Sequence, residues 1–263
     1  MVELDPVIRS FYRDRYLEDQ RLVVPGHGRL EFARTQELLR RWLPPASVVL
    51  DVGGATGVHA RWLAADGHQV TLIDPVREHV EQAATVGTFA AEEGDARALR
   101  QADSSVDVTL LLGPLYHLVD AADRAQALAE AVRVTRPGGV VIAAGINRYG
   151  GLLEAGSNGT LTDDNLHLFT EAFASGQIDG SYGFTVAYFH HADELAGELT
   201  TAGLQDVDVL GVEGPAANIL QNAAPETIDG LLPSAVLFAR LVESDPNLRA
   251  ASPHFLAHGR VAG

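Results

Sequence analysis

The stretch that decides the fold is Val48-Val49-Leu50-Asp51-Val52-Gly53-Gly54-Ala55-Thr56-Gly57. It is an apolar run that ends in an acidic residue and passes directly into a turn of small residues. A helix-like segment, Val58–Asp66, follows at once. Such a strand–turn–helix junction lets a ligand approach bare backbone beside the start of a helix. The identity of that ligand decides what the chain does.

Strand-like and helix-like segments alternate after this junction. The predicted strands are Val48–Val52, Gln69–Ile73, Thr88–Ala91, Val106–Leu112 and Val140–Gly145, with helices at Val58–Asp66, Arg77–Thr85 and Arg124–Arg133. Most of these strands are continuous apolar runs, which are typical of strands covered on both faces. The alternation predicts an α/β fold with a doubly wound, mostly parallel sheet, whose strand C-termini meet at one edge.

Two regions depart from this alternation and suggest the domain organisation. Residues 1–46 are predicted to form a helical N-terminal cap, and residues 47–263 a Rossmann-like domain. Within the latter, residues 147–192 are rich in Gly, Asn, Thr and aromatic residues, which favours a lid inserted over the acceptor site. The remaining predicted segments are helices at Pro6–Gln20, Arg29–Trp42, Ala192–Ala202 and Ile228–Glu243, and strands at Val207–Val212 and His254–Val261.

The composition excludes several classes of function. The chain has 263 residues, no cysteine and no lysine, so disulfides, zinc–cysteine sites, Schiff bases and the P-loop lysine are excluded. A net charge of -16 disfavours nucleic acid. No apolar run reaches the roughly 20 residues of a membrane span, and the first residues lack the pattern of a signal peptide. We therefore expect a cytoplasmic protein with a small-molecule substrate, no nucleic-acid or membrane partner and no metal; the oligomeric state stays open.

The turn after the first strand narrows the choice of ligand. A dinucleotide fingerprint needs G-x-G-x-x-G, and here Ala55 and Val58 replace its second and third glycines. Two further acids follow the next two strands. Asp74 is placed to accept hydrogen bonds from a ribose diol, and Asp95 from the exocyclic amine of adenine. The alternative for each is a helix-capping or turn aspartate.

The segment from about Val48 to Ile146 resembles the class I S-adenosylmethionine-dependent methyltransferases. The resemblance rests on the first motif at residues 49–57, on Asp74, on Gly94-Asp95-Ala96, on Leu111-Leu112-Gly113-Pro114-Leu115-Tyr116-His117-Leu118 and on Val134-Thr135-Arg136-Pro137-Gly138-Gly139. It implies a seven-stranded sheet whose last strand, Pro253–Val261, is antiparallel. The chain departs from the family at Ala55, where a glycine is usual; the added methyl group lies close to the ligand and is tolerated if φ is negative there.

The resemblance also implies which residues bind S-adenosyl-L-methionine. They are Asp51, Gly53, Gly54, Ala55, Gly57, Asp74, Pro75, Gly94, Asp95, Ala96, Leu112 and Gly113. The N-terminal cap is expected to add Tyr16 and Arg34. The alternative for Tyr16 is that it packs, together with Tyr12, along one face of the first helix. The alternative for Arg34 is that it forms a charge pair with Glu31 on an exposed helix.

Methyl transfer is an in-line displacement with a good leaving group, so a protein mainly orients the acceptor and excludes water. A base is needed only where the nucleophile arrives protonated. The candidate bases are His117, His190 and His191. The alternative for His117 is a structural role in shaping the pocket. The alternative for His190 and His191 is a turn at the start of a helix. The residues expected to contact the acceptor are Tyr12, Glu31, Tyr116, Asn147, Arg148 and Phe189.

The sequence therefore predicts methyl transfer to a small hydrophobic or aromatic acceptor, with oxygen favoured over nitrogen or carbon. One alternative is an enzyme of the same fold that binds the cofactor but catalyses a cyclisation or isomerisation. Another is a cofactor-binding module without catalytic activity. A nicotinamide oxidoreductase is disfavoured by Ala55 and Val58.

Overall fold

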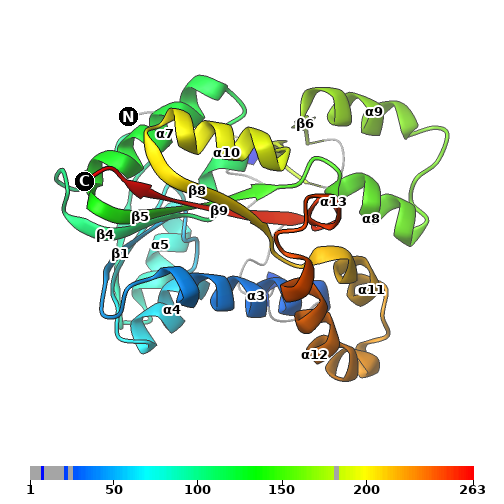
Figure 1. The fold of residues 1–263 in the computed structure, drawn as a ribbon, viewed down its shortest axis with the longest axis horizontal. Coiled ribbons are helices and arrows are strands. Elements are labelled where there is room, and N and C mark those ends of the chain that lie inside the picture. The colour runs from blue at the N-terminus through cyan, green and yellow to red at the C-terminus, as the bar shows by residue number, and fades with distance from the viewer. Residues whose placement is uncertain (1–6, 9–20, 23–25, 181–183) are drawn as a thin grey trace.

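A seven-stranded sheet forms the centre of the molecule, with helices on both faces (Figure 1). The computed structural model describes residues 7–8, 21–22, 26–180 and 184–263. The strand order is β3-β2-β1-β4-β5-β9-β8, and β9 runs antiparallel to both of its neighbours. The strands are β1 (Val48–Val52), β2 (Gln69–Asp74), β3 (Ala90–Glu93), β4 (Val106–Leu111), β5 (Thr135–Ile146), β8 (Leu204–Gly211) and β9 (His254–Val261). The predicted doubly wound fold with an antiparallel last strand is confirmed.

Two hydrophobic layers hold the sheet between its helices. One face packs on α3 (Gly26–Trp42), α4 (Val58–Ala65) and α5 (Arg77–Ala84), and the other on α7 (Ala121–Val134) and α10 (Ala192–Thr201). In β1, Val49 belongs to the first layer, whereas Leu50 and Val52 belong to the second. All three side chains are buried. Burial on both faces explains why the strands are continuous apolar runs rather than alternating ones.

The predicted bounds of β1 and β9 match the structure, whereas β5 begins earlier than predicted. Thr135 already pairs with Val106 of β4, and the register then shifts before Val140 pairs with Val108. The Arg-Pro-Gly-Gly segment, residues 136–139, therefore forms an irregularity within β5 instead of a turn before it. Local sequence patterns do not show such a shift, because it depends on pairing with another strand.

Residues 147–180 and 184–192 form a separate layer at the end of the sheet where β5 ends (Figure 1). They contain α8 (Gly150–Asn158), α9 (Leu166–Ser175) and an antiparallel pair, β6 (Gln177–Asp179) and β7 (Val186–Tyr188). The predicted helix Pro6–Gln20 lies almost entirely outside the described residues.

The C-terminal part of the chain returns to α3. Short helices η1 (Gly214–Ala216), α11 (Ala217–Gln221) and α13 (Pro246–Arg249) accompany the longer α12 (Pro225–Val242), whereas the short helix α6 (Pro114–His117) follows β4. Leu30 of α3 packs with Leu220 and Ile228. Among the described residues, no helix combines the length and apolar character needed to cross a bilayer.

Candidate cofactor and acceptor sites

The turn after β1 has an alternating backbone conformation. Gly53, Ala55 and Gly57 have φ angles of 72°, 47° and 87°, all in the left-handed region. Ala55 therefore has a positive φ, so the condition under which its methyl group is tolerated, a negative φ, is not met. A Cβ atom at Gly53 would lie 2.8 Å from Cδ of Pro114, so glycine is needed there for space as well as for conformation. The turn thus presents bare backbone to the cavity beside it.

Asp74, the last residue of β2, connects this turn to the next helix. Its Oδ2 accepts a hydrogen bond from the Ala55 N–H at 2.9 Å, and its Oδ1 accepts one from the Val76 N–H at 2.9 Å. His79 Nδ1 lies 3.3 Å from the same Oδ1. The buried carboxylate therefore shapes both loops while it lines the cavity at the ends of the strands.

Asp95 is held by an arginine that sequence reasoning missed. Its carboxylate accepts bonds from Arg97 Nε at 2.9 Å and Nη2 at 2.7 Å, and from the Arg97 backbone N–H at 2.8 Å. Arg97 also donates to Asp123 at 2.6 Å. Because Arg97 lines the same cavity, any ligand that reaches Asp95 meets this guanidinium as well.

These residues surround one cavity, called here the cofactor pocket, with an empty volume of about 730 Å³ that includes its open mouth. The predicted residues that line it are Gly53, Ala55, Asp74, Pro75, Gly94, Asp95, Ala96, Gly113, Tyr116 and His117, and the unpredicted ones include His79, Arg97 and Pro114.

The other predicted cofactor residues of these motifs, Asp51, Gly54, Gly57 and Leu112, do not line this pocket. Asp51 is fully buried, and within the described residues neither of its carboxylate oxygens has a hydrogen-bond partner. Burial, with a smaller contribution from Asp74, raises the pKa of Asp51 to about 7. Gly57 is required by packing, since a Cβ there would lie 2.5 Å from Phe89. The back of the turn is therefore structural.

His117 lies between two aromatic rings at the pocket wall. Its ring centroid is 4.6 Å from that of Tyr116 and 6.0 Å from that of Phe184. Burial lowers the pKa of His117 to about 4, against a smaller raising effect of a backbone hydrogen bond with Val186. The imidazole is therefore neutral near pH 7.

A second cavity adjoins the cofactor pocket, and Tyr116 lines both. Its empty volume is about 1660 Å³, including its open mouth. Apolar and aromatic side chains form much of its wall, among them Ile146, Leu152, Phe169, Phe184 and Phe189. Polar and charged side chains gather elsewhere on the wall, among them Arg21, His27, Glu31, Glu213 and His254.

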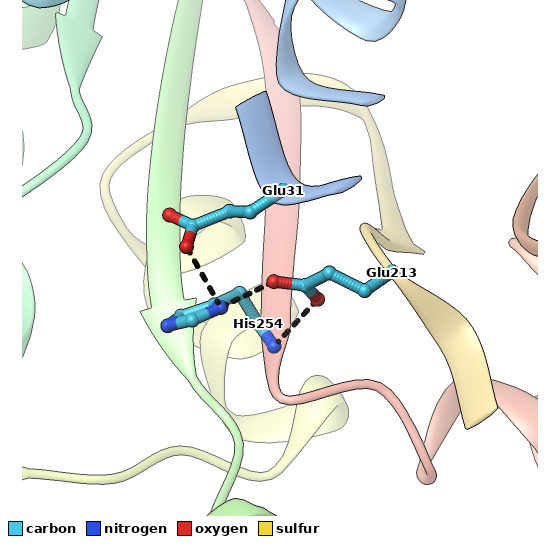
Figure 2. Close-up of side chains that lie close together, drawn as sticks. All are labelled: Glu31, Glu213 and His254. Carbon is cyan, nitrogen blue, oxygen red and sulfur yellow. Dashed lines mark hydrogen bonds and ion pairs between the residues drawn. The ribbon is translucent and has the colours of Figure 1, made fainter. Parts of the chain in front are cut away.

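Three of these polar side chains converge (Figure 2). His254 Nδ1 lies 2.5 Å from Glu213 Oε1 and 3.8 Å from Glu31 Oε2. Arg21 Nη1 contacts both oxygens of Glu31, at 2.7 and 2.8 Å. Of this group only Glu31 was predicted. The 2.5 Å contact joins the imidazole directly to the Glu213 carboxylate through a hydrogen bond.

The electrostatics of this cluster favour charged side chains. Burial by itself would lower the pKa of His254, but Glu31 and Glu213 outweigh it and raise the pKa to about 9. Burial would raise the pKa of Glu31, but Arg21 and His254 outweigh it and lower the pKa to about 2. The imidazole is thus mostly protonated at neutral pH and is held between two carboxylates.

Several predicted site residues lie away from both cavities. Arg34 has no exposed surface; it donates to the Val212 carbonyl at 3.2 Å and is paired with Glu37 and Glu243. The prediction that it contacts the cofactor is wrong, because these partners hold its guanidinium inside the protein. Asn147 is likewise fully buried, and its amide donates to the carbonyls of residues 250 and 252 at 2.7 Å.

The tandem histidines are also structural in their placement. His190 is fully buried, with Nε2 3.4 Å from Glu198. His191 precedes α10, and its backbone N–H donates to Glu194 at 2.9 Å, as in the helix-entry alternative. Neither lines the cofactor pocket or the second cavity, so their placement does not support their assignment as bases.

The remaining predicted acceptor residues divide into two groups. Phe189 and Arg148 line the second cavity, but the Arg148 guanidinium is bound to Glu194 at 2.6 Å and to the Phe189 carbonyl at 3.1 Å. Tyr12 and Tyr16 lie outside the described residues.

Comparison with known proteins identifies the central segment. Residues 49–139 match the family model of a methyltransferase domain. An uncharacterized methyltransferase of Mycobacterium tuberculosis is 38% identical over 102 residues, which are 37% of this chain and 40% of that protein. A ubiquinone/menaquinone biosynthesis C-methyltransferase of Acidiphilium cryptum is 36% identical over 104 residues, 36% of this chain and 40% of that protein. The chain thus matches about two fifths of the length of these relatives.

Solved structures extend the likeness in fold to nearly the whole chain. A methyltransferase of Thermotoga maritima, described as a possible histamine N-methyltransferase, has a TM-score of 0.60 at 18% identity and covers 97% of this chain and 98% of its own. A [4+2]-cyclase has a TM-score of 0.57 at 16% identity, and the match covers 88% of this chain and 81% of the cyclase. The fold alone therefore does not decide the reaction.

The cofactor pocket fits the ligand of the matched family. Gly53 and Ala55 of the turn line it, and the acids Asp74 and Asp95 stand beside them near the ends of β2 and β3. Residues 49–139 therefore match a methyltransferase domain, and S-adenosylmethionine is the methyl donor that this match and the pocket support.

Proposed function

We propose that this protein transfers the methyl group of S-adenosylmethionine to an oxygen atom of a small molecule bound in the second cavity. The observation that carries the proposal is the position of Tyr116, which lines both cavities. An acceptor in the second cavity would therefore lie beside the donor. The aromatic wall favours a hydrophobic or aromatic acceptor, and the charged cluster favours one that carries a polar group.

The roles of the chain follow from the geometry. When bound, the cofactor supplies a methyl carbon activated by a positively charged sulfur. Asp74 and the Asp95–Arg97 pair would hold its nucleoside end, and the backbone at Gly53 and Ala55 would lie against it. The neutral His117 forms part of the wall. The protein would thus act mainly by orienting the two reactants and excluding water.

The proposal also assigns a role to residues 147–192. Gly151, Leu152 and Ala155 of α8, and Phe169 and Ala172 of α9, line the second cavity. We therefore retain the division into an N-terminal cap (residues 1–46) and a methyltransferase domain (residues 47–263), whose insertion at residues 147–192 covers the acceptor.

Two substitutions in α8 test the proposal. A Cβ atom at Gly151 would lie 3.9 Å from Phe189 and 4.0 Å from Phe169, so Gly151→Leu would extend a side chain into the second cavity. Gly156 is exposed, and a Cβ atom there would meet no described atom within 4 Å, which makes Gly156→Leu the matched control. We expect Gly151→Leu to lose methyl transfer and keep its affinity for S-adenosylhomocysteine, and Gly156→Leu to keep both.

The measurement is transfer of a tritium-labelled methyl group to a panel of phenols and matched anilines, with calorimetry for cofactor affinity. Labelled phenol ethers in the wild type would support oxygen as the methylated atom. Labelled amines without ethers would refute that preference. If Gly151→Leu transferred methyl groups as fast as the wild type, the second cavity would not be the acceptor site.

A further inference from the structure

We propose that His254 is the general base of the acceptor site: its Nε2 takes the proton of the acceptor hydroxyl group while Glu213 holds its Nδ1. This proposal rests on the proposed function, because it needs a hydroxyl acceptor in the second cavity. Sequence reasoning placed the base on His117, His190 or His191, whereas the structure places a different histidine on the cavity wall.

The topology brings His254 to the functional edge of the sheet. It is the first residue of β9, and β9 runs antiparallel to β5, so His254 pairs with Ile146 at the carboxyl end of that strand. The parallel strands β1, β2 and β4 end at the same edge. The His254 side chain is 25% exposed and lines the second cavity.

Glu213 holds the imidazole in one orientation. Its Oε1 lies 2.5 Å from His254 Nδ1, and its Oε2 accepts bonds from the His254 backbone N–H at 3.1 Å and from Ser252 Oγ at 2.8 Å. The carboxylate is thus anchored at both oxygens. In Figure 2 the other ring nitrogen, Nε2, points away from both carboxylates. A base oriented through one ring nitrogen by a buried carboxylate is a recurrent catalytic arrangement.

The surrounding charges set the basicity of His254. Glu213 precedes η1, Glu31 and His27 lie on α3, and Arg21 is bound to Glu31. The two carboxylates stabilise the imidazolium, whereas burial, Arg21 and His27 oppose it, and the pKa settles at about 9. The neutral form that accepts a proton therefore becomes more populated as the pH rises toward 9.

The acceptor O–H bond breaks, and its proton moves to Nε2 of the neutral His254. The oxygen forms a bond to the methyl carbon while the carbon–sulfur bond breaks, and that electron pair stays on sulfur as a neutral thioether. The imidazolium, stabilised by Glu213, then releases its proton to water.

A spectroscopic probe tests the base without a known natural acceptor. The probe is para-nitrophenol, whose anion is yellow, added to the protein saturated with S-adenosylhomocysteine. We expect the bound phenol to ionise at least about tenfold more readily than in water, because its proton passes to His254 or its anion pairs with the imidazolium. His254→Gln should abolish this shift, Glu213→Gln should reduce it, and His167→Gln on the exposed part of α9 should leave it unchanged.

Kinetics with a phenol methylated by the wild type give the second readout. We expect His254→Gln to lower kcat about 10²-fold or more, with unchanged affinity for S-adenosylhomocysteine. The wild-type rate should rise with pH and level off near pH 9, in line with the pKa of His254. Glu213→Gln should move this rise to lower pH, an effect that a purely structural role would not produce. Circular dichroism checks that each variant is folded.

The outcomes separate this proposal from the proposed function. If the wild type binds S-adenosylhomocysteine but neither binds the phenol nor methylates any acceptor of the panel, the second cavity is not an acceptor site and both proposals fail. If transfer occurs and His254→Gln keeps the spectral shift and the rate, only the base is refuted. A chelator could also abolish methyl transfer by the wild type, with recovery when a divalent ion is added. That result would show that Glu31, Glu213 and His254 bind a metal ion, and it would overturn the role of His254 as a base.

Discussion

Ala55 shows how a single residue carries strain at this site. It is the only non-glycine among the three turn residues with positive φ, and its N–H is bound by Asp74. The left-handed conformation costs an alanine roughly 1 kcal/mol more than a glycine. The sequence shows an alanine where the family has a glycine. Its positive φ is seen only in the structure, where the Ala55 N–H donates to Asp74 of β2.

We predict that Ala55→Gly raises the free energy of unfolding by about 1 kcal/mol, since glycine adopts positive φ without a steric penalty. The measurement is equilibrium urea unfolding. Ala129→Gly, at an exposed position within α7, is the control and should lower stability by about 1 kcal/mol through helix propensity alone. A loss of stability in Ala55→Gly similar to that of the control would show that Ala55 is not strained.

At the scale of elements, Arg34 ties α3 to the C-terminal part of the chain. Its guanidinium reaches the Val212 carbonyl after β8 and Glu243 at the end of α12. Arg41 of α3 binds the same Glu243 at 2.5 Å. The periodicity of α3 predicted a helix here, but it did not predict which elements would cover this arginine, because β8 and α12 lie about two hundred positions away along the chain.

We predict that Arg34→Met lowers the free energy of unfolding by about 3 kcal/mol, because it leaves the partly buried Glu243 with one cation fewer. Urea unfolding measures this loss. The variant should bind S-adenosylmethionine normally at temperatures where it is folded, as calorimetry can show. Arg40→Met, which removes an exposed pair with Asp66, should cost at most about 1 kcal/mol. A specific loss of cofactor affinity in a fully folded Arg34→Met variant would restore the cofactor-binding role that the structure denies.

At the scale of the whole molecule, buried histidines make stability depend on pH in two directions. Burial lowers the pKa of His59 and His117 from 6.5 to about 4. Their contribution to the free energy of unfolding is therefore complete above about pH 6.5 and is lost as the pH falls toward 4. Despite burial, Glu31 and Glu213 raise the pKa of His254 from 6.5 to about 9, so its contribution is complete below about pH 6.5 and is lost as the pH rises toward 9. Burial also raises the pKa of Asp51 to about 7, so this carboxyl group stabilises the folded state increasingly as the pH falls below 7. It therefore offsets part of the stability that His59 and His117 lose in acid.

We predict that the free energy of unfolding is greatest near pH 6.5 and declines on both sides. Urea unfolding at a series of pH values measures this profile. In His254→Gln the decline between about pH 6.5 and 9 should become shallower, since that variant has no proton to lose there. An unchanged alkaline decline in His254→Gln would show that the imidazolium does not stabilise the fold.

The sequence by itself determined the sheet, the glycine turn and the acids at or just after the ends of β1, β2 and β3, because each of these is a local pattern that repeats strand by strand. Arg97 stands two residues after Asp95, so the same local pattern could have predicted it as a residue of the pocket. The start of β9 was within reach as well, since an antiparallel last strand places its first residue at the functional edge. Only the tertiary structure decided the second cavity and its cluster of Arg21, Glu31, Glu213 and His254. Their side chains come from segments far apart in sequence, and long-range pairing leaves no local signature.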